Sequence, residues 1–206
     1  MNNTKQNMSQ NSYIRLFHAS PNAPSVDVYA NGNMIANGLS YKQLTNYLSV
    51  PSGNYNIEIF PEGQKNNPVL SGQVNIPANS AFTAAAISEL PDISMLLIQE
   101  IYKPRLNKDK SYVRFVHLSP NAPAVDITLP NGTKLFQDVA YKEHTDYLEV
   151  DPGNYTLQVK PTGGNQTVLT VPDLNLERGK IYSVYAVGLV GQEPSLEAVM
   201  VTDSTY

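Results

Sequence analysis

The chain has 206 residues, 41% of them hydrophobic, with a formal net charge of −4 and a pI near 5.3. This charge argues against a nucleic-acid partner, because such binding depends on lysine and arginine meeting phosphate. The sequence has no cysteine, which excludes disulfides, thiolate catalysis and cysteine metal sites. No apolar run approaches the roughly 18 to 20 residues that a membrane-spanning helix needs.

Residues 1–12 (MNNTKQNMSQNS) are polar and lack the apolar stretch of a signal peptide. We interpret them as a flexible polar N-terminal arm. The alternative is that the arm docks on a neighbouring subunit.

After the arm, turn signals separate short runs rich in Val, Ile, Tyr, Thr and Leu. This rhythm is typical of an all-β sandwich or barrel. Asn31-Gly32 favours a tight hairpin turn, and residues 54–60 (NYNIEIF) alternate polar with apolar side chains, as antiparallel strands with one buried face do. In the first half of the chain we expect strands near residues 13–18, 26–30, 33–36, 45–50, 55–61, 72–76, 81–88 and 95–101.

The chain contains two copies of one unit. Tyr13 to Val28 reads YIRLFHASPNAPSVDV, and Tyr112 to Ile127 reads YVRFVHLSPNAPAVDI. Copies this far apart indicate a duplicated domain, so we expect one β-sandwich over residues 13–101 and a second over 111–206. We expect the two to fold separately. The charged segment 102–110 (YKPRLNKDK) is interpreted as the linker between them.

Each copy carries the motif His-x-Ser-Pro-Asn-Ala-Pro-x-Val-Asp. The prolines restrict the backbone, and the short polar side chains can hydrogen-bond nearby backbone groups, which predicts a rigid corner between two strands. We therefore assign the motif a structural role. Its residues are His18, Ser20, Pro21, Asn22, Pro24 and Asp27 in the first copy, and His117, Ser119, Pro120, Asn121, Pro123 and Asp126 in the second.

The histidine, serine and aspartate of the motif are also the residue types of a nucleophilic triad. We do not expect catalysis, because His18 follows Ile14 and Leu16 on the alternating face and should point into the core. No oxyanion donors accompany Ser20 in its proline-bounded turn. A buried, hydrogen-bonded histidine is the preferred interpretation, and a metal ligand is the alternative.

Two features concern side chains expected to point away from the core. Arg15 and Asp27 should pair on the outer face of the first unit, and Arg114 and Asp126 should do the same in the second. Tyr47 and Tyr147 are candidate outer-face contacts, since sugar-binding sites often stack rings on aromatic side chains.

The repeated motif resembles the signature of the bacterial domain-of-unknown-function family 4397. The resemblance covers the chain apart from the arm and the linker, and it implies two tandem immunoglobulin-like or transthyretin-like antiparallel β-sandwich domains. Such domains occur in bacterial envelope, secreted and related proteins, and the resemblance implies no activity and no cofactor. Exported relatives usually begin with a leader or lipid anchor, and residues 1–12 do not resemble one. We therefore expect either that the protein is not exported by the usual route or that a leader lies outside this sequence.

We therefore predict a non-enzymatic structural or interaction protein of a bacterial envelope, matrix or spore-surface layer, without a catalytic, cofactor or metal site. The expected partner is a protein, through self-association or another surface protein, at a spore or cell surface, with the cytoplasm as the alternative. The alternative function is a glycan- or small-ligand-binding module. We expect little room for a small-molecule pocket, because side chains should fill a sandwich of this size.

Overall fold

The computed structural model describes residues 11–100 and 106–203. Within these residues every regular element is a β-strand. The first domain contains β1 (Asn11–His18), β2 (Val26–Ala30), β3 (Asn33–Leu39), β4 (Leu48–Pro51), β5 (Gly53–Pro61), β6 (Leu70–Ile76), β7 (Ala81–Ile87) and β8 (Ser94–Gln99). The second contains β9 (Ser111–His117), β10 (Val125–Thr128), β11 (Lys134–Val139), β12 (Leu148–Val150), β13 (Gly153–Pro161), β14 (Leu169–Leu176), β15 (Ile181–Val187) and β16 (Glu197–Asp203).

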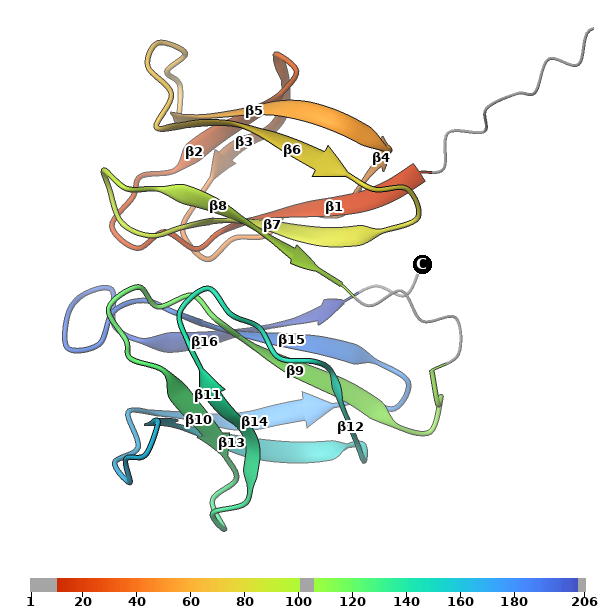
Figure 1. The fold of residues 1–206 in the computed structure, drawn as a ribbon, viewed down its shortest axis with the longest axis vertical. Coiled ribbons are helices and arrows are strands. Elements are labelled where there is room, and N and C mark those ends of the chain that lie inside the picture. Colours follow the sequence, from red (N-terminus) through yellow and green to blue (C-terminus); the bar gives the residue numbers. More distant parts are fainter. Residues whose placement is uncertain (1–10, 101–105, 204–206) are drawn as a thin grey trace, which may run out of the picture.

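These strands form four four-stranded sheets, two in each domain. The outer sheets have the orders β3-β2-β5-β6 and β11-β10-β13-β14, and the inner sheets have the orders β4-β1-β7-β8 and β12-β9-β15-β16. Figure 1 shows the two sandwiches one above the other, with the inner sheets facing each other across the middle. The prediction of an all-β tandem of sandwiches is confirmed.

The alternation of side chains selects the core of each sandwich. In β5, Ile57 and Ile59 are buried while Glu58 between them is only partly covered, and Leu157 and Val159 of β13 repeat the pattern. Such burial of one face is the main favourable contribution to folding a sheet.

The prediction of wholly antiparallel sheets was wrong for one pair of strands in each domain. β1 runs parallel to β7, with Tyr13 opposite Ala81, and β9 runs parallel to β15. Parallel neighbours need a long crossover, and the chain between β1 and β7 makes one by building the outer sheet. The alternation of polar and apolar residues indicates which face of a strand is buried. It does not indicate whether the strand runs parallel or antiparallel to its neighbour.

The structure also moves several expected boundaries. Asn11 and Ser12, expected in the arm, belong to β1, where they pair with Pro51 and Val50 of β4. The arm's other residues, 1–10, and residues 101–105 around the linker lie outside the described residues. Within the remaining linker, Lys110 forms an ion pair with Asp151 at 2.7 Å, which attaches this segment to the second domain.

A third apolar core joins the two domains, in addition to one core inside each sandwich. Phe17 and Ile98 of the first domain and Val116 and Tyr185 of the second are almost completely buried in it. The rings of Phe17 and Tyr185 lie 4.9 Å apart, a normal aromatic contact distance. The central strands of the inner sheets, β1, β7, β9 and β15, are therefore buried on both faces, and the two domains share an interface. That each domain folds on its own stays a prediction.

Candidate functional site

The motif of the first domain forms a corner that hydrogen bonds hold from within. His18 is buried at the end of β1, and its Nε2 lies 3.0 Å from the carbonyl oxygen of Pro24. Because a carbonyl oxygen can only accept, Nε2 carries the proton. The Ser20 hydroxyl donates to the carbonyl of Ser88, and Asn22 adopts the left-handed backbone conformation, at φ 62°.

The second copy repeats this arrangement. His117 Nε2 lies 3.0 Å from the carbonyl oxygen of Pro123, and the Ser119 hydroxyl donates to the carbonyl of Gly188 at 2.6 Å. Gly188 has φ 84°, and a Cβ atom there would lie 2.2 Å from the Ser195 carbonyl oxygen, so only glycine fits. Asn121 exchanges two hydrogen bonds with the backbone of Val190, at 2.8 and 3.0 Å.

The motif does not assemble a triad. Burial lowers the pKa of both His18 and His117, which favours the neutral form of each imidazole. Within the described part of the chain, neither histidine is hydrogen-bonded to the hydroxyl of the motif serine or to the carboxylate of the motif aspartate. The same residues contain no group of three or more His, Cys, Asp or Glu side chains placed to hold a metal ion.

The motif aspartates anchor loops over the outer sheets. Asp27 accepts hydrogen bonds from Gly38 N at 2.8 Å and Gly63 N at 2.9 Å. Asp126 accepts from Lys134 Nζ at 2.7 Å and Asp138 N at 3.0 Å, and the Lys134 hydrogen bond is the largest cause of its lowered pKa.

The expected Arg15–Asp27 and Arg114–Asp126 pairs were therefore wrong. Each arginine lies on an inner sheet and each aspartate on an outer sheet, so their side chains point to opposite sides of the sandwich.

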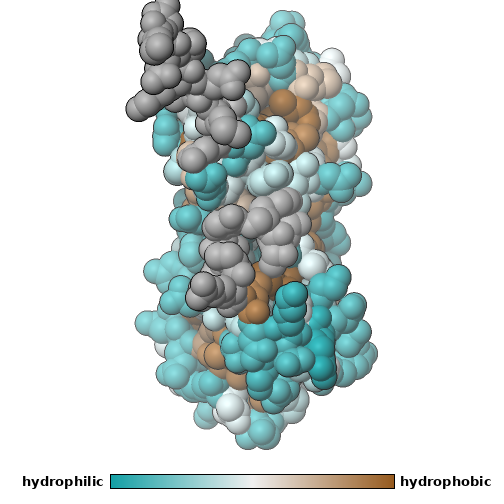
Figure 2. Space-filling model, turned by 90° about the vertical axis from the view of Figure 1, so that its right-hand side faces the viewer, coloured by the Kyte–Doolittle hydropathy of each residue, from teal (hydrophilic) through white to brown (hydrophobic). Residues whose placement is uncertain are grey.

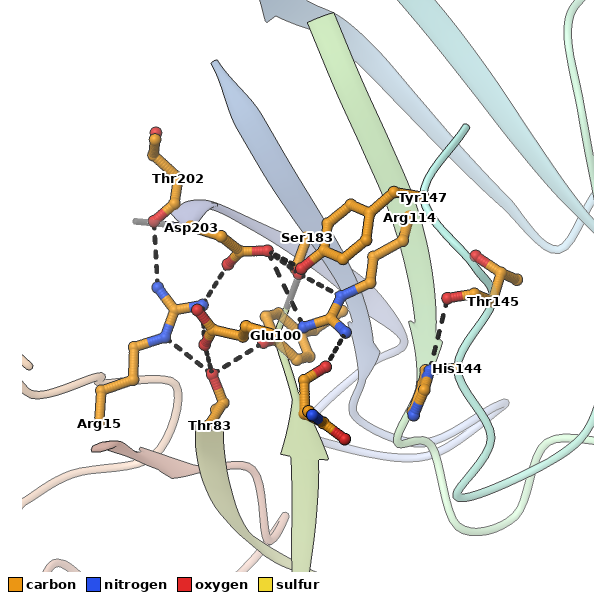
Figure 3. A network of polar contacts seen from close by, with 12 residues as sticks. Arg15, Thr83, Glu100, Arg114, His144, Thr145, Tyr147, Ser183, Thr202 and Asp203 are labelled. Carbon is orange, nitrogen blue, oxygen red and sulfur yellow. Dashed lines mark hydrogen bonds and ion pairs between the residues drawn. The ribbon is translucent and has the colours of Figure 1, made fainter. Parts of the chain in front are cut away.

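The two arginines instead enter a buried polar network between the domains (Figure 3). Arg15 donates from Nε to the Thr83 hydroxyl at 2.8 Å and from Nη1 to the carbonyl of Thr202 at 3.1 Å. Its Nη2 contacts the carboxylates of Glu100, at 3.1 Å, and Asp203. Since Thr202 and Asp203 lie in β16, this single side chain crosses the domain interface.

Arg114 makes the reciprocal contacts from the second domain. It donates from Nε to the Ser183 hydroxyl at 2.7 Å and from Nη1 to the carbonyl of Gln99, at the end of β8, at 2.6 Å. Its Nη2 lies 3.8 Å from Asp203 Oδ2. Each arginine therefore reaches the backbone at the end of the last strand of the other domain, and the duplicated sequence yields a matching pair of contacts.

Charge is balanced inside this network, which holds two arginines and two carboxylates. Burial is the first cause that raises the pKa of Glu100, and the charge of Asp203 is the second. Burial alone would lower the pKa of Arg15, but the negative groups around it reverse the direction and raise it. Hydroxyl groups supply further hydrogen bonds to the two carboxylates. Thr83 donates to Glu100 at 2.6 Å, and Ser183 donates to Asp203 at 2.5 Å.

Tyr47 and Tyr147 belong to the same network. Their hydroxyls donate to Glu100 at 2.5 Å and to Asp203 at 2.6 Å. The Arg15 guanidinium lies 4.8 Å from the centre of the Tyr47 ring, a cation–π distance, and Arg114 repeats the contact with Tyr147 at 4.5 Å. Both rings point away from their own sandwich core, as expected, but the direction away from the core is toward the other domain.

The core of the first domain contains an apolar cavity of about 250 Å³. This contradicts the expectation that side chains fill the interior. Protein interiors are normally close-packed with few voids larger than a water molecule, so a space of this size in the core is unusual. The sequence signal was available, because the first copy has Ala84 and Leu16 where the second has Val184 and Phe115.

In residues 11–100 and 106–203 no helix is long and apolar enough to cross a membrane.

No curated protein sequence matches the chain. Among solved structures, the C-terminal domain of AlgF from P. aeruginosa is 25% identical, with TM-score 0.37, covering 47% of this chain and 100% of that one. The CBM26 module CBMbc of Eubacterium rectale Amy13K, solved with maltoheptaose, is 8% identical, with TM-score 0.30 and coverage of 94% and 97%.

These structural similarities are too low to support a functional argument. The family comparison is decisive for classification. A model described as "Domain of unknown function (DUF4397)" matches residues 12–128 and again residues 111–206, so the two matches together span both domains. The chain therefore belongs to the DUF4397 family.

Proposed function

We propose that this chain is a non-catalytic structural and interaction protein of a bacterial envelope, matrix or spore-surface layer. The observation that carries the proposal is the buried interface, in which Arg15 and Arg114 each donate to a backbone carbonyl of the other domain beside a shared apolar core. We infer that these contacts hold the two sandwiches as one rigid unit. A rigid pair of domains suits a structural protein that must keep its shape. An enzyme whose domains close around a substrate needs domains that move.

The repeated motif supports the non-catalytic part of the proposal. Its histidines are hydrogen-bonded to the carbonyls of Pro24 and Pro123, and its serine hydroxyls donate to the carbonyls of Ser88 and Gly188. Groups held in this way brace a loop and are not positioned to attack a substrate.

Partners would then meet the outer sheets. Their edge strands are β3 and β6 in the first domain and β11 and β14 in the second. An edge strand can take up a strand from another chain, by self-association or with a different surface protein. The N-terminal arm remains our candidate for such a contact, although residues 1–10 lie outside the described part of the chain.

Immunolabelling of the source cells tests the proposed location. We expect label at the cell or spore surface, together with concentration-dependent assembly of the full chain in light scattering. The control chain lacks residues 1–10. A protein that stays in the cytoplasm and remains monomeric at every concentration would overturn the proposal.

A small-ligand-binding role is the second candidate function, and the cavity of the first domain is the observation that favours it. A glycan at Tyr47 or Tyr147 is disfavoured, because the hydroxyls of both tyrosines and one face of each ring are already engaged in the network.

A further inference from the structure

We propose that the cavity of the first domain is a binding site for an uncharged aliphatic chain. The lining residues include no charged side chain. They are mainly aliphatic, and among the described residues the polar ones are limited to His18, Asn31, Asn33 and Tyr55. A sugar needs several convergent hydrogen-bonding groups, and a charged ligand needs a counter-charge, so this wall selects an apolar molecule.

The volume suits a short chain. A dry apolar cavity of roughly 150 Å³ is already large enough to bind benzene, and this one measures about 250 Å³. At about 30 Å³ for each water-sized group, it would hold a chain of roughly eight heavy atoms.

The cavity reaches the surface at the sheet edges. Ile35 of β3 and Met95 and Leu97 of β8 line it and are only half-buried, and both strands are edges of their sheets. Figure 2, which views the molecule from its right-hand side, shows hydrophobic side chains among hydrophilic ones at the surface of the upper domain. Because part of the cavity wall is solvent-accessible, we expect that a chain can enter without unfolding the sandwich.

His18 is one of the few polar residues on the wall, and it supplies no charge. Its Nε2 donates to the carbonyl of Pro24. Its Nδ1 is buried without a hydrogen-bond partner among the described residues, and the equivalent His117 Nδ1 accepts from Ser119 N at 3.3 Å, so this atom faces the turn of the motif. The wall therefore offers an entering chain mainly apolar contacts.

The second domain shows how the same fold looks with larger core side chains. Leu16 lies opposite Ala84 in the β1–β7 pair, and Phe115 lies opposite Val184 at the same place in the β9–β15 pair. Leu16 and Ala84 both line the cavity, and at these two positions the second copy carries larger side chains. These positions are therefore where larger side chains, already accommodated by the same fold, would occupy the space.

The full chain, labelled at its isoleucine methyl groups, is titrated with 1-octanol and followed by NMR. We expect saturable shifts at Ile14 and Ile57, which line the cavity, and none at Ile127 and Ile181 of the second domain. A second titration uses dioctanoylphosphatidylcholine below its micelle concentration. Binding of 1-octanol alone identifies a free aliphatic molecule as the ligand, and binding of both identifies a lipid acyl chain.

The blocking variant is Leu16→Phe/Ala84→Val, which installs the side chains that the second domain already accommodates. It should weaken binding by at least about tenfold, because a few methyl groups decide occupancy of an apolar pocket. Ala84→Val alone is the milder version if the double variant does not fold, and Val184→Ala, in the second domain, is the control that leaves binding unchanged.

Absence of saturable shifts up to the solubility limit of 1-octanol would overturn the inference. Equal shifts in both domains, or unchanged affinity in a folded blocking variant, would do the same. The inference does not depend on the structural role proposed above, because the location and assembly of the protein are measured independently of this titration.

Discussion

Replacing Arg15 with methionine removes the central cation of the inter-domain network while keeping a long side chain. The variant loses contacts with Thr83, Glu100, Thr202 and Asp203 together. The two carboxylates then share the site with Arg114 alone, and the balanced network becomes net negative. Removing one partner of a buried ion pair costs about 3–5 kcal/mol, mostly because the other charge is left uncompensated.

The free energy of unfolding of the full chain should therefore fall by about 3–5 kcal/mol in Arg15→Met. Urea denaturation measures it, followed by circular dichroism for the strands and by tyrosine fluorescence, since the chain has 13 tyrosines and no tryptophan. The midpoint should fall while the slope of the transition stays the same, as expected for a loss of stability without a change in exposed surface.

Lys42→Met is the matched control. Lys42 pairs with Glu197 across the same interface at 2.8 Å, but both side chains are more than one-third exposed, and such pairs contribute only about 0–1 kcal/mol. Arg15→Met/Glu100→Gln restores charge balance and should be more stable than Arg15→Met. The reasoning is refuted if Arg15→Met and Lys42→Met lose equally little stability, or if Glu100→Gln rescues nothing.

Three further predictions follow from the same contacts. Burial raises the pKa of Glu100 above its usual 4.5, so the folded state holds this proton to higher pH than the unfolded chain. The melting temperature of the wild type relative to Glu100→Gln should then fall as the pH rises above about 4.5, and a relative rise would contradict the assigned direction. His18→Ala and His117→Ala should each lose about 1–3 kcal/mol on thermal unfolding, by leaving the Pro24 or Pro123 carbonyl unpaired; unchanged melting in both would argue against a bracing role. Phe17→Ala, in the inter-domain core, should lose about 3–5 kcal/mol by urea denaturation, and a loss below about 1 kcal/mol would show that this core contributes little.

Much of the fold was predictable because local patterns decide it. The alternation around Ile57 and the Asn31-Gly32 turn each specify an element without reference to the rest of the chain. The inward orientation of His18 followed from the same alternation. These features depend on neighbours only a few residues away, which the sequence displays directly.

What the sequence did not reveal depends on long-range placement. Arg15 alternates as an outer-face residue, and only the stacking of the second domain turns that face into an interior. Tyr47 illustrates the same effect, since its partner Glu100 lies 53 residues away. The cavity could have been suspected from Ala84 and Val184, but comparing core volumes requires knowing which positions face each other across the sheet.

The central claim is that the two domains form one rigid unit, and the distance between them tests it most directly. The chain has no cysteine, so nitroxide labels attach only to cysteines that are introduced. We choose Gln73→Cys in β6 and Asn175→Cys in β14, which are exposed positions on the outer sheets. Pulsed electron paramagnetic resonance should give one narrow distance distribution, and the distribution should broaden in Arg15→Met. A broad or multi-peaked distribution in the otherwise wild-type chain would contradict the account.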